Sequence, residues 1–174
     1  MEAIQRTFGL LIGKVTSTDD PQGEGRVRVR IPQLGEGNEL YWAPVMSHFA
    51  GKDRGFWSMP EVDDECVVAF ERGDPQFPMV LGFLWNTQAK PPSTVTNERM
   101  WRSVNGHTIR FLDPDPKDGD LGAVVVEDAQ GNKVTLSNGK VTVRSVAVLE
   151  IDAPTIILKG PGYHRVVAPN SNPI

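Results

Sequence analysis

Cysteine is nearly absent from this chain of 174 residues, because Cys66 is the only one. A single cysteine excludes an intrachain disulfide framework and suits folding in a reducing cytoplasm. Long apolar runs are lacking too, and none approaches the length needed to span a membrane. The first ten residues carry Glu2, Gln5 and Arg6, unlike a secretory leader. We therefore expect a protein made in a reducing cytoplasm without a leader of its own.

An excess of positive charge is also missing. The chain has 18 Lys and Arg against 22 Asp and Glu, which gives a net charge of −4. Proteins that grip phosphate backbones need clustered basic side chains. We therefore do not expect nucleic acid as a partner.

Patterns that carry metal binding are weak. Residues 113–120 superficially resemble a calcium loop, but two prolines stiffen the range and Val124 stands where such a loop needs a Glu. Asp, Pro and Gly are common turn formers, so we interpret this range as a solvated turn. The three histidines have no metal-ligand spacing and no cysteine beside them: His48, His107 and His164. The sequence predicts no metal and no cofactor.

Glycine and proline are abundant instead, with 17 and 14 copies, and they interrupt nearly every candidate helix. An all-β fold follows. Residues 26–31 alternate without error and place Val27, Val29 and Ile31 on one face. Residues 66–70 and 79–84 form near-continuous apolar runs, as expected for strands of a closed barrel. We predict a five-stranded Greek-key barrel over residues 9–86.

Several short motifs in the first half resemble those of one family. They are Gly13-Lys14-Val15, residues 25–32, Trp42-Ala43-Pro44-Val45, residues 50–55, residues 60–70, and residues 73–82 closed by Leu84-Trp85-Asn86. In this order and spacing they resemble the N-terminal OB-fold domain of the phage baseplate assembly protein V family, which includes the VgrG spikes of type VI secretion. The resemblance implies an OB-fold barrel within a homotrimeric spike at the centre of a contractile injection machine.

The acidic residues at 61–65 match a turn of this family, Pro-x-Val-Gly-Asp-Glu, rather than a pair of catalytic carboxylates. Asp63 stands where the family usually has Gly, and Asp tolerates a left-handed turn conformation. The chain has no nucleophile elbow and no phosphate-binding Gly-rich loop. We therefore expect no catalytic residues and a non-enzymatic structural protein.

The second half has a different rhythm. Residues 87–103, with two adjacent prolines, are interpreted as an extended linker. Residues 104–162 contain short pieces with apolar residues at period two: Val124 and Val126, Val134 and Leu136, Val141 and Val143, Val146 and Val148, Leu149 and Ile151, Ile156 and Leu158. Pieces this short cannot close a core within one chain, whereas three copies around a common axis can. We predict a trimeric intertwined β-helix or β-prism spike, which the resemblance also implies.

Residues 163–174 are interpreted as the tip segment of the spike. Some relatives close their apex with iron held by a His-x-His pair, and His164 has no such companion. Three copies of Val166, Val167 and Ile174 would instead expose an apolar platform. We predict that this platform receives a separate PAAR-like tip protein.

The resemblance also implies two further contacts: a baseplate hub that holds residues 1–86, and a target cell envelope that the spike touches transiently. Two alternatives of other classes remain. One is an OB-fold protein that binds single-stranded nucleic acid through Arg26, Arg28 and Arg30, with Trp42, Phe56 or Trp57 as stacking platforms. The other is a trimeric receptor-binding fibre. The sequence does not choose between phage tail, tailocin, extracellular injection system and type VI apparatus.

Overall fold

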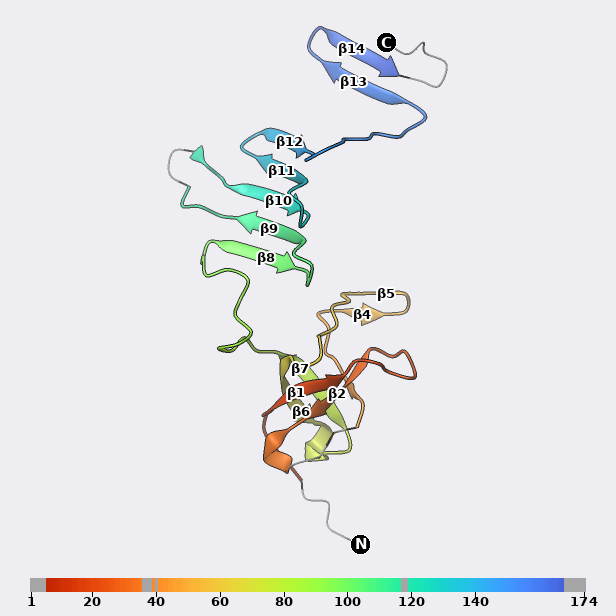
Figure 1. Ribbon diagram of the computed structural model, residues 1–174, viewed down its shortest axis with the longest axis vertical. Coiled ribbons are helices and arrows are strands. Elements are labelled where there is room, and N and C mark those ends of the chain that lie inside the picture. Colours follow the sequence, from red (N-terminus) through yellow and green to blue (C-terminus); the bar gives the residue numbers. More distant parts are fainter. Residues whose placement is uncertain (1–5, 36–38, 40, 117–118, 168–174) are drawn as a thin grey trace. The chain divides into compact units, whose positions relative to one another are not determined.

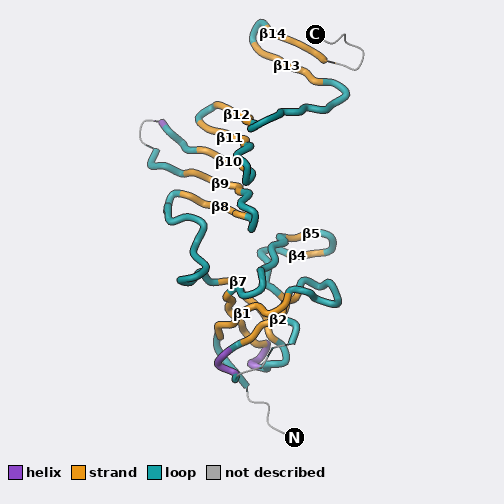
Figure 2. Tube along the Cα trace, in the orientation of Figure 1, coloured by secondary structure: helices purple, strands orange, loops and turns teal. Residues whose placement is uncertain are grey.

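The computed structural model describes residues 6–35, 39, 41–116 and 119–167, and it is all-β apart from two single-turn 3₁₀ helices. The chain divides into two compact units, Met1–Pro91 and Pro92–Ile174. Figure 1 labels most strands of each unit, and Figure 2 shows how much of the chain is loop. None of the described helices is long and apolar enough to cross a membrane.

The first unit is a small antiparallel sheet rolled on itself. The order of its strands is β3-β2-β1-β6-β7. Short 3₁₀ turns follow β2 and β6, at Pro32–Leu34 and Glu71–Gly73. The strands are β1 (Leu11–Ser17), β2 (Arg26–Arg30), β3 (Ala43–Pro44), β6 (Glu65–Phe70) and β7 (Pro78–Phe83), and a two-stranded hairpin of β4 (Ala50–Gly51) and β5 (Arg54–Gly55) lies between β3 and β6.

Contacts between the two edge strands bring this sheet close to a barrel. Val45, just after β3, forms a parallel bridge with Val80 of β7. The backbone N–H of Met46 donates to the carbonyl of Val80 at 2.8 Å. Five strands in this order, with one parallel contact closing an otherwise antiparallel sheet, form the partly open Greek-key barrel of an OB-fold. The barrel predicted from the sequence is confirmed.

The interior of the barrel is filled by the inward residues of its strands. Val27, Val29 and Ile31 are fully buried, as their alternation predicts. The remaining core residues are Val15, Ala43, Cys66, Val68, Phe70 and Val80. Gly13 allows β1 and β2 to approach closely, because a Cβ at this position would lie 2.4 Å from Cγ1 of Val29.

The second unit contains a five-stranded antiparallel meander and a separate hairpin. The meander follows the chain without crossovers, in the order β12-β11-β10-β9-β8. A two-residue turn, Asn138-Gly139, joins β11 to β12. Both residues have positive φ, at 47° and 77°, so the hairpin turn that the sequence suggests is confirmed. The strands are β8 (Glu98–Arg102), β9 (Thr108–Leu112), β10 (Ala123–Glu127), β11 (Lys133–Ser137) and β12 (Lys140–Arg144), and the hairpin consists of β13 (Ile156–Gly160) and β14 (Tyr163–Val167).

The structure differs from the sequence reading in two places. Strand β8 lies inside the range 87–103 that we interpreted as linker, because its five residues pair in register with β9. Residues 145–155, whose valines suggested strands, form no strand here, since they have no neighbouring strand to pair with among the described residues. An intertwined β-helix is not seen in this single chain. The finer division into linker, spike and tip therefore stays a prediction.

Candidate functional site

The most distinctive surface of the described residues is one face of the five-stranded meander. The register places alternate residues of neighbouring strands side by side: Trp101 opposite Ile109, Phe111 opposite Val124, and Leu136 opposite Val141. We call this surface the apolar face. Its members are Trp101, Ile109, Phe111, Val124, Val126, Val134, Leu136, Val141 and Val143.

Most side chains of the apolar face are exposed within one chain. The exposed fraction is 61% for Trp101, 66% for Val141 and 36% for Val134, while Val124 is half-buried. Among the described residues of the second unit, only Thr108 and Val125 are buried, and both belong to the opposite face. The register also puts Arg99 on this side, opposite Phe111, where it pairs with Asp113. An exposed apolar surface of this kind on a folded domain marks a site of association.

The opposite face of the meander is polar and internally paired. Arg110 forms ion pairs with Glu98 of β8 and Glu127 of β10. Lys133 of β11 lies 3.2 Å from the other carboxylate oxygen of Glu127. The hydrogen bond from Lys133, together with the charge of Arg110, holds the pKa of Glu127 below its usual range. These charges pair with one another across four strands. The polar face therefore needs no partner, whereas the apolar face has no second layer packed against it among the described residues.

The turns at one end of the meander hold one another in place. The side-chain amide of Asn138 donates to a carboxylate oxygen of Asp120 at 2.8 Å, and the backbone N–H of Gly122 donates to the same oxygen at 2.9 Å. These contacts hold the pKa of Asp120 below its usual range, with the Asn138 bond as the largest cause. Asp120 therefore holds these turns together.

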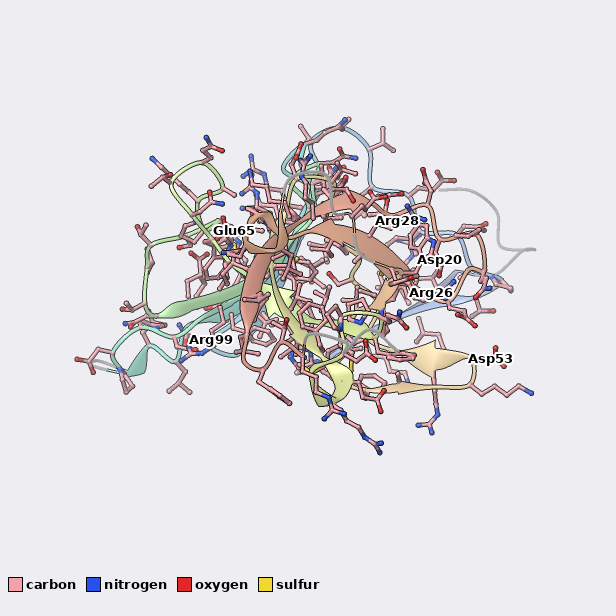
Figure 3. The ribbon with its side chains drawn as sticks, turned by 90° about the horizontal axis from the view of Figure 1, so that it is seen from below. Asp20, Arg26, Arg28, Asp53, Glu65 and Arg99 are labelled. Atoms are coloured by element: carbon pink, nitrogen blue, oxygen red, sulfur yellow. The ribbon has the colours of Figure 1, made fainter. Side chains whose placement is uncertain are left out.

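Two of the three arginines of β2, Arg26 and Arg28, are paired with acidic side chains. Arg26 binds Asp20 with two nitrogens, at 2.7 and 3.1 Å, and the side chain of Asp20 is only 5% exposed. Figure 3 shows these two side chains next to each other at the barrel surface. The Arg26 bond, with three backbone N–H donors, holds the pKa of Asp20 well below its usual range. This arginine is therefore not available for phosphate.

Arg28 is held in the same way. It pairs with Glu39, and its guanidinium carbon lies 5.2 Å from the ring centroid of Trp42. Thr16 and Arg28 both donate to Glu39 and lower its pKa. Trp42 thus faces its own arginine, while Phe56 packs edge-on against His48 at 5.4 Å. This geometry does not favour the nucleic-acid alternative, which needs unpaired arginines beside open aromatic rings.

The other residues weighed in the sequence have structural environments. Cys66 is buried, and its burial raises the pKa of the thiol to about 11. Asp63 has a positive φ of 73°, so the left-handed turn expected from its place in the acidic cluster is confirmed. Asp64 accepts the backbone N–H of Glu61 at 2.9 Å within that turn. Over the part of the chain that is described, no group of three His, Cys, Asp or Glu could hold a metal ion.

The predicted tip residues are only partly placed. Val166 and Val167 lie in β14, where the structure describes the backbone and not these two side chains. Ile174 lies outside the described residues. The tip platform therefore stays a prediction. The sequence reading missed the full extent of the apolar face, because it paired valines within single pieces and did not include Trp101, Ile109 and Phe111 in the same surface.

Comparison with known proteins shows which family of domains the barrel is similar to. Residues 11–85 match the family model of the type VI secretion system/phage-baseplate injector OB domain. This range is similar to an injector OB domain. The matched range runs from the start of β1 to just beyond β7, so the family boundary and the observed barrel coincide. The resemblance read from the sequence motifs is confirmed.

Curated relatives of this VgrG-like chain include proteins named as type VI secretion system spike proteins. The chain is 31% identical over 90 residues to the actin cross-linking toxin VgrG1 of Vibrio cholerae, which covers 45% of this chain and 8% of the relative. It is 28% identical over 113 residues to the type VI secretion system spike protein VgrG5 of Pseudomonas aeruginosa, covering 63% of this chain and 14% of the relative. The spike protein VgrG1a of the same species is 33% identical over 84 residues, 41% of this chain and 13% of the relative.

The coverage of these matches has two consequences. This chain spans between 8% and 14% of the length of the three relatives. The match to VgrG5 covers 63% of 174 residues, more than the first 85, so it continues beyond the injector OB domain into the second unit. The similarity supports a structural role of the spike type for a chain that contains this OB domain.

Proposed function

We propose that this chain is a non-enzymatic component of a contractile injection machine and forms its central spike as a homotrimer. The observation that carries this proposal is the apolar face of the second unit. Three amphipathic sheets can enclose their apolar faces around a threefold axis and leave their charged faces in water. One copy alone leaves nine apolar side chains at least partly exposed, including Trp101 at 61%.

The polar face supports this arrangement. Its ion pairs link four strands of one sheet, so each sheet can remain flat and aligned while its other side packs against two further copies. In a spike assembled in this way, hydrogen-bonded strands transmit the force of contraction. The trimer withstands this load if it unfolds slowly. The function that follows is mechanical: the trimer pierces a target envelope when the machine contracts.

The barrel would dock on the baseplate hub. On the outer side of β1, β6 and β7, Ile12 lies opposite Val67, and Ala69 lies opposite Met79. Ile12 and Met79 are 36% and 37% exposed, so this wall of the barrel has apolar side chains available to a partner. On β2, Arg26 and Arg28 are neutralised by Asp20 and Glu39. We therefore assign hub docking to the wall that contains Ile12 and Met79.

Oligomeric state tests the proposal. Multi-angle light scattering of the gel-filtered protein should give the mass of a trimer. Leu136→Glu places a charge on the apolar face and should shift the protein toward monomer, because an unpaired charge in an enclosed interface costs several kcal/mol. Thr135→Glu, one residue earlier in β11 but on the polar face, is the matched control and should remain trimeric. A monomeric wild-type protein would refute the spike.

The tip is tested separately. Deleting residues 166–174 should abolish association with a PAAR-like protein and leave the trimer intact, since the meander would not be changed. About one tightly bound iron or zinc ion per trimer in the purified protein would contradict this, because it would indicate that His164 closes the apex.

A further inference from the structure

The chain between β7 and β8 is held by hydrogen bonds on both sides of a short gap. Figure 2 shows this stretch, residues 84–97, as loop. It contains the boundary of the two compact units, which falls between Pro91 and Pro92. We interpreted residues 87–103 as one extended linker, but hydrogen bonds fix all but three residues of this range to one unit or the other.

Asn86 fixes the barrel side of the gap. Its side-chain oxygen accepts the backbone N–H groups of Gln88 and Ala89 at 2.9 and 2.7 Å. Its own backbone N–H donates to the carbonyl of Ala89 at 2.9 Å. Its side-chain amide donates to a carboxylate oxygen of Glu65, in β6, at 3.1 Å. The chain up to Ala89 is therefore tied to the barrel.

Ser93 fixes the side of the gap that leads to the meander. Its hydroxyl donates to a carboxylate oxygen of Glu98, in β8, at 2.6 Å and accepts the backbone N–H of Val95 at 3.1 Å. The backbone N–H of Glu98 donates to the carbonyl of Val95 at 3.2 Å, which closes the turn before the strand. The carbonyl of Asn97 accepts the backbone N–H of Asp113, just after β9, at 2.9 Å. The chain from Ser93 onward is therefore tied to the meander.

The three residues between these anchors are Lys90, Pro91 and Pro92. They are exposed, and none of them forms a hydrogen bond with the described residues of either unit. Proline fixes its own φ at about −65° and lacks a backbone N–H. A residue before a proline is restricted to extended conformations, and this applies to Lys90 and to Pro91. The backbone of this stretch is therefore stiff without support from either unit.

We propose that residues 90–92 form a stiff arm that limits how far the two units can rotate against each other. An extended proline-rich chain rises about 3.1 Å per residue, so three residues give an arm of about 9 Å. The bonds of Asn86 and Ser93 begin directly beyond the arm and prevent the neighbouring loops from adding slack. This inference is independent of the oligomeric state, because every contact that supports it lies within one chain.

A stiff arm suits a protein that is loaded along its chain. Relative motion is the default for two domains joined by a linker. A Gly- and Ser-rich linker behaves as a random coil and must be stretched before it carries force, whereas a proline-rich segment is already extended and acts as a semi-rigid spacer. A displacement of one unit would therefore reach the other with little delay. Asn86 and Ser93 are positioning residues, because they act through the direction of the chain.

Time-resolved fluorescence anisotropy of the full chain tests the arm. A fluorophore is attached to Met79→Cys in β7, where the side chain is partly exposed, and native Cys66 is buried and does not compete. With the arm intact, the label should report mainly the slow tumbling of the whole particle. Pro91→Gly with Pro92→Gly should increase the amplitude of the faster component at least about twofold, because the barrel then rotates on a flexible chain. Replacing both prolines by alanine should have an intermediate effect.

Variants of the anchors test the two ends of the arm. Asn86→Asp keeps the acceptor oxygen for its own loop but loses the donor to Glu65 and places two like charges together. It should release the loop from β6 and enlarge the faster component. Ser93→Ala should do the same from the side of the meander. Pro161→Gly, in the turn between β13 and β14, makes the same chemical change outside the arm and is the matched control, which should leave the decay unchanged.

Two results would overturn the arm. A faster component in the native protein as large as in the double-glycine variant would show that the prolines do not stiffen the chain. An unchanged decay in the double-glycine variant would show that the relative motion is limited elsewhere. Light scattering on the same samples keeps the proposed function separate: a monomer would refute the spike, while the comparison of native and glycine variants would still decide the arm.

Discussion

Gly13 gives a quantitative test of the barrel packing. A Cβ at this position would lie 2.4 Å from Cγ1 of Val29 and 3.1 Å from the carbonyl oxygen of Arg30. The same Cβ would lie 3.1 Å from Cγ1 of Ile31, so it meets atoms of three consecutive residues at the end of the neighbouring strand β2. Ordinary contacts between carbon atoms are about 3.5 to 4.0 Å. Gly13→Ala therefore requires β1 and β2 to separate.

The size of the effect follows from two opposing contributions. Overpacking of a filled core costs about 1 to 3 kcal/mol. Replacing glycine by alanine recovers about 0.4 to 1 kcal/mol, because the unfolded chain loses conformational freedom. Gly13→Ala should thus lower the free energy of unfolding of the barrel by roughly 1 to 2 kcal/mol.

Gly82 of β7 provides a matched control. A Cβ there meets no atom within 4 Å, and neither glycine has a left-handed φ. Gly82→Ala should leave the free energy of unfolding unchanged or raise it by up to about 1 kcal/mol. Urea denaturation of the protein truncated after Pro91, followed by tryptophan fluorescence, measures both variants in the unit that contains them.

A double mutant identifies the obstacle. Val29→Ala removes the nearest carbon, so Gly13→Ala should cost about 1 kcal/mol less in that background than in the native barrel. If Gly13→Ala and Gly82→Ala have equal effects, the close approach of β1 and β2 is not a constraint on the barrel, and the reasoning fails.

Three other outcomes are expected from the structure. The protein truncated after Pro91 should fold but remain monomeric in gel filtration, because the apolar face belongs to the second unit; a tight trimer would place the interface in the barrel. Cys66 should resist a thiol reagent at pH 8 until urea is added, since burial raises its pKa to about 11; rapid labelling of the folded protein would contradict this. Asp20 has a lowered pKa, so its stabilisation is present above the ordinary value of about 4 and is lost as the pH falls below it. Urea titrations at pH 7 and pH 3 should show a smaller loss of stability on acidification for Asp20→Asn than for the wild type, and equal losses would rule out this linkage.

The sequence predicted those parts of the fold that depend on local alternation and turn chemistry. Val27, Val29 and Ile31 are buried as predicted. Strict alternation of apolar and polar residues places every second side chain on the same face of a strand, and the apolar face is the one that packs inward. Asp63 and Asn138 occupy left-handed conformations because short side chains of this kind tolerate them. These are properties of a few consecutive residues, so a single sequence reveals them.

What the sequence did not reveal depends on pairing between distant segments. Strand β8 was assigned to a linker because two adjacent prolines, Pro91 and Pro92, lie in the same range. Only its register with β9, which places Trp101 beside Ile109, reveals the strand. The ion pair of Arg28 with Glu39 depends on where residue 39 lies after the loop. Residues 145–155 have the composition of a strand and yet form none, because secondary structure of this type requires a neighbouring strand.

The uniform strand length of the meander has a consequence for how such a protein can change its reach. Strands β8 to β12 are each five residues long, and each contributes to the same apolar face without support from a second layer of its own chain. An inserted or deleted hairpin of the same pattern would preserve the chain direction and the register of every other strand. One extra residue within a strand, in contrast, would turn the following side chains to the wrong face. The sheet can therefore lengthen or shorten in steps of two strands, while the cross-section of the assembly stays the same.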